Sequence, residues 1–98
     1  LMTPHALDIP FVFDNTHAER TVYGFTTGTA EERAMADKIS DSWISFARSG
    51  NPDTGKLPDW PVYTGASRQV MVLNNESQVV EDPIRERRQV MQRVLNLA

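Results

Sequence analysis

The sequence contains no cysteine. This absence excludes a disulfide framework, a thiol nucleophile and any cysteine-ligated metal site. It also favours a reducing compartment, so we expect a cytoplasmic protein. Secretion stays open as an alternative, because secreted bacterial proteins can also lack cysteine.

Basic charge and long apolar runs are also scarce. The chain carries 10 Lys and Arg against 13 Asp and Glu, a net charge of -3. A nucleic-acid partner is not expected, because phosphate binding needs a basic face. No apolar run approaches the roughly 18 residues of a membrane-spanning helix, so no span is expected. The first residues show no basic-then-apolar signal peptide.

The chain is short, with 98 residues of which 40% are hydrophobic. That size allows one small domain with a thin core, or a part of a larger domain. The opening "LMTPHALDIP" places Met2 behind Leu1 and enters apolar sequence at once. We therefore expect a piece of a longer protein. The alternative is a small complete protein with a short leader.

A long amphipathic helix is predicted over residues 29–49. Thr29 is a candidate N-cap and Glu32 follows three positions later, which is a capping box. Apolar residues then recur at helical spacing, and Gly50 can adopt the left-handed conformation that ends a helix. The helix itself is expected over Ala30–Ser49. The apolar positions are Met35, Ile39, Trp43 and Phe46. Of the large aromatics, Trp43, Phe46 and Trp60 are expected in the core.

A short β-hairpin is predicted over residues 69–80. The runs "RQVMVL" and "SQVV" are rich in apolar and β-branched residues, and they flank Asn74-Asn75-Glu76. Such content with an asparagine pair between the runs is typical of two strands joined by a tight connection.

A terminal helix is predicted over residues 82–96. Asp82 is a candidate N-cap and Pro83 stands at the first helical position. Arginines cover one side of this helix, and an acidic chain makes a solvated face the better interpretation than a nucleic-acid site. A narrow apolar stripe follows on the other side, made of Ile84, Met91, Val94 and Leu95.

Most catalytic constellations are missing from the chain. Ester hydrolysis by a serine needs a nucleophile in a Gly-x-Ser-x-Gly turn. Gly65-Ala66-Ser67 comes closest, but no second glycine follows, so Ser67 is expected to be a loop serine. There is no phosphate-binding glycine loop, and His5 and His17 are twelve residues apart with no helix between them. No metal and no cofactor are therefore expected.

His5 is the remaining candidate for chemistry. From composition alone, a histidine in such a position is most often an exposed or hydrogen-bonded loop residue. The alternative is a general base, whose pKa suits proton transfer near neutral pH. Pro4 restricts the backbone before the ring and "DIPFVF" anchors the chain behind it. This context favours an imidazole held on a short loop against a rigid body.

The segment "HALDIPFVF" resembles the histidine motif of type B carboxylesterases, the cholinesterase and para-nitrobenzyl esterase family. "ISDSWISFARSGNP" is similar to the penultimate helix of that family, and "LPDWPVY" to the Trp-Pro-x-Tyr that follows it. "RQVMVLNN" and "VVEDPIRERRQV" are similar to its closing hairpin and last helix. The resemblance covers nearly the whole chain in the family's order.

The resemblance implies an α/β fold, with residues 1–98 as the C-terminal portion of an α/β-hydrolase catalytic domain. Residues 1–15 would form its histidine loop, and the central parallel sheet would lie upstream. In that fold the chain order is nucleophile, acid, histidine. A C-terminal piece would then hold His5 without the nucleophile or the triad acid.

The resemblance also implies a role for three neighbouring residues. His5 would be the catalytic base of a serine esterase. Asp8 matches an acidic position and would support His5 from behind; three residues along the same loop is poor geometry for the triad acid itself. Leu7 matches a position that lines the substrate pocket in relatives, and plain packing is its equal alternative.

The function expected from this reading is hydrolysis of a small carboxylic ester through an acyl-enzyme. The partner would be the rest of the parent enzyme, and the chain alone would be inactive. Two alternatives stay open. One is a cholinesterase-like binding or adhesion module without catalysis, which an upstream serine would argue against. The other is a small autonomous interaction domain, which predicts a cooperative thermal melt of the isolated chain.

Overall fold

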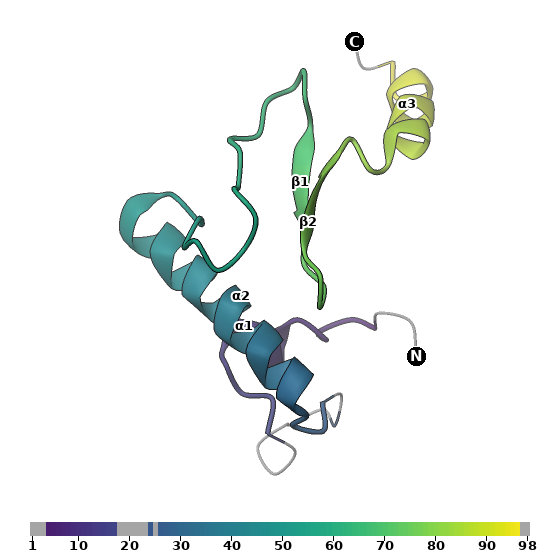
Figure 1. Ribbon diagram of the computed structural model, residues 1–98. Helices are drawn as coiled ribbons and strands as arrows, with labels where there is room; N and C mark the ends of the chain where they lie inside the picture. Colours follow the sequence, from purple (N-terminus) through teal and green to yellow (C-terminus); the bar gives the residue numbers. More distant parts are fainter. Residues whose placement is uncertain (1–3, 18–23, 25, 97–98) are drawn as a thin grey trace.

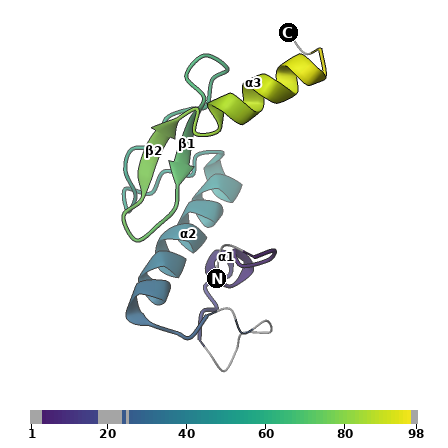
Figure 2. The same cartoon turned by 90° about the vertical axis from the view of Figure 1, so that its right-hand side faces the viewer.

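The computed structural model describes residues 4–17, 24 and 26–96. Its elements in chain order are α1 (Ile9–Val12), α2 (Ala30–Ser49), β1 (Gln69–Val72), β2 (Gln78–Glu81) and α3 (Arg85–Val94). The long helix α2 packs against α1, and the hairpin follows it in the chain and lies on another side of it (Figures 1 and 2). α3 projects away from the hairpin.

α2 has the bounds expected from the sequence. The Thr29 hydroxyl accepts from the Glu32 N–H at 3.2 Å, and the Glu32 carboxylate accepts from the Thr29 N–H at 3.0 Å. Gly50 ends the helix with a φ of 76°, and its N–H donates to the Phe46 carbonyl at 2.7 Å. No helix in the described part of the chain, α2 included, is long and apolar enough to cross a membrane.

Burial on α2 differs from the expectation. Ala36 and Ile39 are buried, but Trp43 is 57% exposed and Phe46 is 54% exposed. The prediction that these two aromatics lie in the core is wrong for this chain, because the described segments next to them leave more than half of each side chain exposed. Trp60 is half-buried.

The predicted histidine loop, whose residues 1–3 lie outside the described part, contains a helical turn. α1 is four residues long and has Pro10 in its first turn, where the missing N–H costs no hydrogen bond. Pro10 is buried, and α1 packs against α2. The segment after His5 is therefore a braced turn of helix and not an open loop.

The hairpin forms between β1 and β2 in antiparallel register, with Val70 opposite Val80 and Met71 opposite Val79. Met71 is the buried residue of β1. At the turn, the Ser77 hydroxyl accepts from the Asn74 N–H at 3.2 Å and donates to the Asn74 carbonyl at 2.9 Å. The second strand ends at Glu81, one residue beyond the expected range.

The terminal helix begins later than expected. α3 starts at Arg85, and Asp82 is not its N-cap. Asp82 has a φ of 45°, and its N–H donates to the Arg68 carbonyl at 2.9 Å, so its backbone belongs to the end of the hairpin. Its carboxylate binds arginines of α3 instead of helical N–H groups.

The described chain is more open than a compact domain of its length. Its radius of gyration is 15.9 Å, against about 13 Å for a compact domain of 100 residues. No residue of α3 is buried. Among the residues that the structure describes, few apolar side chains are buried, namely Pro10, Ala36, Ile39, Leu57 and Met71. These elements therefore bury only a small part of the apolar surface that their sequence supplies.

Candidate active-site segment around His5

His5 lies on a tight turn. The Leu7 N–H donates to the Pro4 carbonyl at 3.3 Å, which closes a four-residue turn with His5 and Ala6 at its centre. Ala6 has a φ of 68°. A positive φ at the third position is what a type II turn requires, and glycine or another small residue suits it best. The turn presents the His5 side chain to solvent.

This turn is continuous with α1. The Ile9 N–H donates to the Ala6 carbonyl at 3.3 Å, and the Phe11 N–H donates to the Asp8 carbonyl at 3.0 Å. Because α1 packs on α2, the position of the His5 backbone is fixed relative to the longest helix of the chain. The residues behind the histidine thus act as its structural support.

The three predicted site residues share this turn but do not contact one another through hydrogen bonds. Asp8 is exposed, precedes α1 and makes no side-chain capping bond. In the ranges that the structure describes, no hydrogen bond or ion pair joins the Asp8 carboxylate to the His5 ring. Leu7 is half-buried. The expected support of His5 by Asp8 is therefore not a direct contact in this chain.

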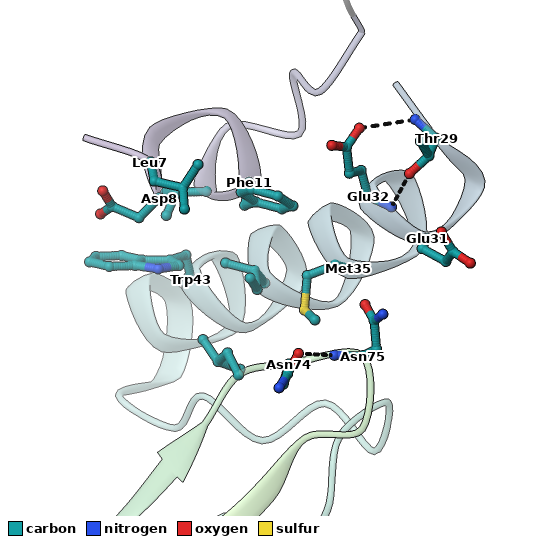
Figure 3. Close-up of a pocket in the computed structure, with 13 residues that line it drawn as sticks. Leu7, Asp8, Phe11, Thr29, Glu31, Glu32, Met35, Trp43, Asn74 and Asn75 are labelled. Atoms are coloured by element: carbon teal, nitrogen blue, oxygen red, sulfur yellow. Dashed lines mark hydrogen bonds between the residues drawn. The ribbon is translucent and has the colours of Figure 1, made fainter. Parts of the chain in front are cut away.

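An open groove of about 710 Å³ runs between α1, α2 and the hairpin turn. Figure 3 shows Leu7 over Trp43 on one side of α2, and the Met35 side chain pointing to the hairpin turn on the other side. Leu7 and Asp8 line the groove and His5 does not. Because His5 is not part of this groove, the place of Leu7 in a substrate pocket stays a prediction.

The Glu32 carboxylate lines the groove, but it already accepts backbone hydrogen bonds. Glu32 accepts backbone hydrogen bonds from Thr27 and Thr29, both at 3.0 Å. Partial burial raises the pKa of Glu32, but the backbone N–H groups of Thr29 and Thr27 outweigh it and hold that pKa below its ordinary value. Glu32 is therefore an ionised capping group and a poor proton acceptor.

Ser67 has a structural role in a turn. Its N–H donates to the Thr64 hydroxyl at 3.1 Å, and the two hydroxyls lie 2.8 Å apart. Nothing in this arrangement activates Ser67 as a nucleophile, as expected from the missing glycine. Across the described residues, no three His, Asp or Glu side chains are grouped closely enough to hold a metal ion.

The sequence profile of the carboxylesterase family matches residues 1–92. The chain belongs to this family. The para-nitrobenzyl esterase of Bacillus subtilis strain 168 is 37% identical over 86 residues, which is 87% of this chain and 17% of that protein. Carboxylesterase 5A of Mus musculus is 41% identical over 59 residues, which is 60% of this chain and 10% of that protein.

Solved carboxylesterase structures contain the same arrangement of elements. The Geobacillus stearothermophilus carboxylesterase EST55, crystallised at pH 6.8, superposes with a TM-score of 0.74 at 41% identity. The superposition covers 88% of this chain and 19% of that structure. The family resemblance expected from the histidine motif is thus confirmed. The chain spans less than a fifth of the length of these relatives.

Two features of the segment were not found from sequence. The first is the left-handed backbone of Ala6, whose only signal was a small residue directly after the histidine. The second is the hydrogen bond that Arg88, six residues away, donates to the Asp82 carboxylate. It was missed because Asp82 followed by Pro83 also satisfies the sequence rule for a helix N-cap.

Proposed function

We propose that residues 1–98 are the C-terminal part of an α/β-hydrolase catalytic domain, and that His5 is the general base of a serine carboxylesterase. One observation carries the proposal. In a segment that matches the carboxylesterase family, the histidine stands exposed on a strained turn that α1 and α2 brace. An exposed, rigidly held imidazole suits proton transfer to and from groups supplied by another part of the protein.

The mechanism would be acyl transfer. His5 takes the proton of an upstream serine as that serine attacks the ester carbonyl, and gives it to the departing alkoxide. It then takes a proton from the water that attacks the acyl-enzyme, and gives it to the serine oxygen as the acid leaves. An upstream carboxylate would hold the ring, and upstream backbone amides would bind the oxyanion. No cofactor enters this chemistry.

The neighbours of His5 would act through position. Leu7 would line the acyl or alcohol side of the site, and Asp8 would support the turn on which His5 stands. The substrate class is a small carboxylic ester, and the partner is the preceding part of the same enzyme. The chain by itself would be inactive, because it holds neither the nucleophile nor the triad acid.

The test uses the full natural polypeptide that carries this segment and a short-chain nitrophenyl ester. His5→Ala should lower kcat/KM by roughly 10³-fold or more, as removal of a triad member does. His17→Ala is the matched control, because His17 is the other histidine of the chain and is also exposed. It should keep the parent rate.

A different result would favour the non-catalytic alternative. If the parent protein has no esterase activity, or if His5→Ala keeps the rate of His17→Ala, His5 is a structural residue. The chain would then belong to a binding or adhesion module that retains the carboxylesterase fold.

A further inference from the structure

The indole of Trp43 lies beneath the residues that follow His5. Figure 3 shows Leu7 and Asp8 over the Trp43 ring, in the groove described above. A second hollow, of about 560 Å³, lies between α1 and α2. Among the described residues, three line both hollows, namely Asp8, Val12 and Trp43. These three side chains therefore form the wall between the hollows, and α1 meets α2 there on the Trp43 ring.

The α1 side of this contact is continuous with the His5 turn. Asp8 and Val12 lie one helical turn apart, and the Val12 N–H donates to the Asp8 carbonyl at 2.9 Å. Leu7, directly before Asp8, closes the His5 turn through its own N–H. A ring beneath these three residues therefore supports both the end of the His5 turn and the first turn of α1.

Trp43 is suited to this role, and the neighbouring aromatic residue of α2 is not. A tryptophan ring is large and flat and turns about only two side-chain bonds, so it offers a broad surface with little freedom to move. Phe46 is three residues further along α2 and is exposed to a similar degree, 54% against 57% for Trp43. It lines neither the groove nor the hollow between α1 and α2. Contact with the His5 turn thus distinguishes Trp43 from the other exposed aromatic residue of the helix.

We propose that Trp43 is a positioning residue, whose ring holds the His5 imidazole in place by supporting the residues behind it. This proposal rests on the proposed function of His5 as a general base. It also gives Asp8 a definite part, because Asp8 supports His5 through its contact with Trp43 and needs no hydrogen bond to the imidazole. Loss of the Trp43 ring lets α1 shift on α2 and moves the imidazole away from the reacting groups.

A displaced imidazole impairs some ester substrates more than others. His5 gives a proton to the departing alkoxide, and an alkoxide is a poor leaving group without that proton. Nitrophenolate is a stable anion and leaves without it. The two kinds of ester therefore share the attack by serine but differ in their need for proton delivery by His5. The ratio of their kcat/KM values reports the position of the imidazole.

The test compares benzyl acetate with 4-nitrophenyl acetate in the full natural polypeptide. The two esters share the acyl group and have leaving groups of similar size. Trp43→Leu should lower kcat/KM for benzyl acetate by about tenfold or more, and for the nitrophenyl ester by at least about threefold less. Partial unfolding does not produce this difference, because it lowers both values by the same factor. Phe46→Leu is the matched control and should keep the parent ratio, whereas a parent ratio in Trp43→Leu would overturn the proposal.

Two further variants test the contact from each side. Trp43→Phe keeps a flat ring at the same position and should restore most of the parent ratio. Val12→Ala removes the side chain that α1 places on the ring, and should shift the ratio in the same direction as Trp43→Leu. A parent ratio in Val12→Ala, or a Trp43→Phe variant as impaired as Trp43→Leu, would show that the ring does not act through α1.

A double variant separates this proposal from the catalytic role of His5. If Trp43 acts only through His5, adding Trp43→Leu to His5→Ala should change the residual rate by less than about twofold. An equal fall in both backgrounds would overturn the positioning role. A fully active His5→Ala variant would reject the base itself. An inactive His5→Ala variant with a parent ratio in Trp43→Leu would retain the base and reject the positioning role.

Discussion

The guanidinium of Arg88 holds the carboxylate of Asp82 where the hairpin passes into α3. Arg88 Nε lies 3.0 Å from one carboxylate oxygen of Asp82, and a terminal nitrogen of Arg88 lies 2.5 Å from the other. Arg85 adds a third contact at 3.2 Å. The Asp82 side chain is only 7% exposed. This two-pronged contact fixes the direction of α3 relative to the hairpin.

Loss of Arg88 should therefore destabilise the protein. Arg88→Met in the full natural polypeptide keeps the aliphatic part of the side chain but leaves the Asp82 carboxylate with weaker pairing. We expect the melting temperature to fall by about 2 °C or more. Arg87→Met is the control, because Arg87 is exposed and makes no ion pair with any described residue. Equal melting temperatures for the two variants would show that the contact between Arg88 and Asp82 does not stabilise the protein.

The same contact predicts a pH dependence. The hydrogen bonds and charge of Arg88 hold the pKa of Asp82 below its ordinary value, against the opposing effect of burial. The folded protein therefore binds this proton less readily than the unfolded chain does. The stabilisation is complete above the unfolded pKa, about 4, and is lost as the pH falls through the lower folded pKa.

Asp82→Asn makes this dependence measurable. The difference in denaturation midpoint between the parent protein and Asp82→Asn should be largest near neutral pH and should shrink below about pH 4. Thermal or urea denaturation at a series of pH values gives the comparison. A difference that stays constant through acid would mean that the Asp82 charge does not contribute.

The left-handed backbone of Ala6 predicts that few side chains are tolerated at this position next to the histidine. Ala6→Gly relieves the left-handed strain, which costs roughly 1 kcal/mol in a residue with a Cβ atom, so esterase activity should stay near the parent value. Ala6→Val places a β-branched residue at a φ of 68° and should displace His5. We expect kcat/KM to fall by about tenfold or more, as small misplacements of catalytic groups do.

A matched substitution separates backbone strain from size. Ala66→Val introduces the same side chain on an exposed turn where the φ of Ala66 is not positive. It should leave the activity near the parent value. Full activity of Ala6→Val would show that the turn can adopt another conformation without moving His5.

The capping box of α2 predicts that loss of the Thr29 hydroxyl destabilises the protein by the amount typical of a lost N-cap. Thr29→Ala removes the hydroxyl that accepts from the Glu32 N–H, and should lower the free energy of unfolding by about 1 kcal/mol. Thr29→Ser restores the acceptor and should recover most of the loss. Urea denaturation of the full natural polypeptide measures both. If Thr29→Ser is as unstable as Thr29→Ala, the hydroxyl is not the cause.

The elements that could be predicted from sequence are those whose determinants are local. α2 has its cap, its apolar spacing and its terminating glycine within its own residues, so its bounds follow from Thr29, Glu32 and Gly50. The hairpin is similar, because the alternating strands and the Asn74-Asn75 turn are adjacent in the chain.

The errors arose where contacts are not local. Asp82-Pro83 satisfies the rule for a helix start, but the Asp82 N–H donates to the Arg68 carbonyl, fourteen residues away, and the helix begins at Arg85. Trp43 and Phe46 have the helical spacing of core residues, but spacing does not supply the segment that must cover them. The candidate site shows the same difference. The motif singled out His5 as a candidate from adjacent residues, whereas the left-handed φ of Ala6 required the structure.

α3 has a consequence for the order in which this region unfolds. The helix has ten residues and buries none of them, while isolated helices shorter than about 12–15 residues are marginal in water. The helix is therefore stabilised mainly at its N-terminal end, where its arginines bind Asp82. Amide exchange in a separated segment should form a gradient, slowest beside the hairpin and fastest toward Val94, so that this helix frays inward while α2 keeps its protection.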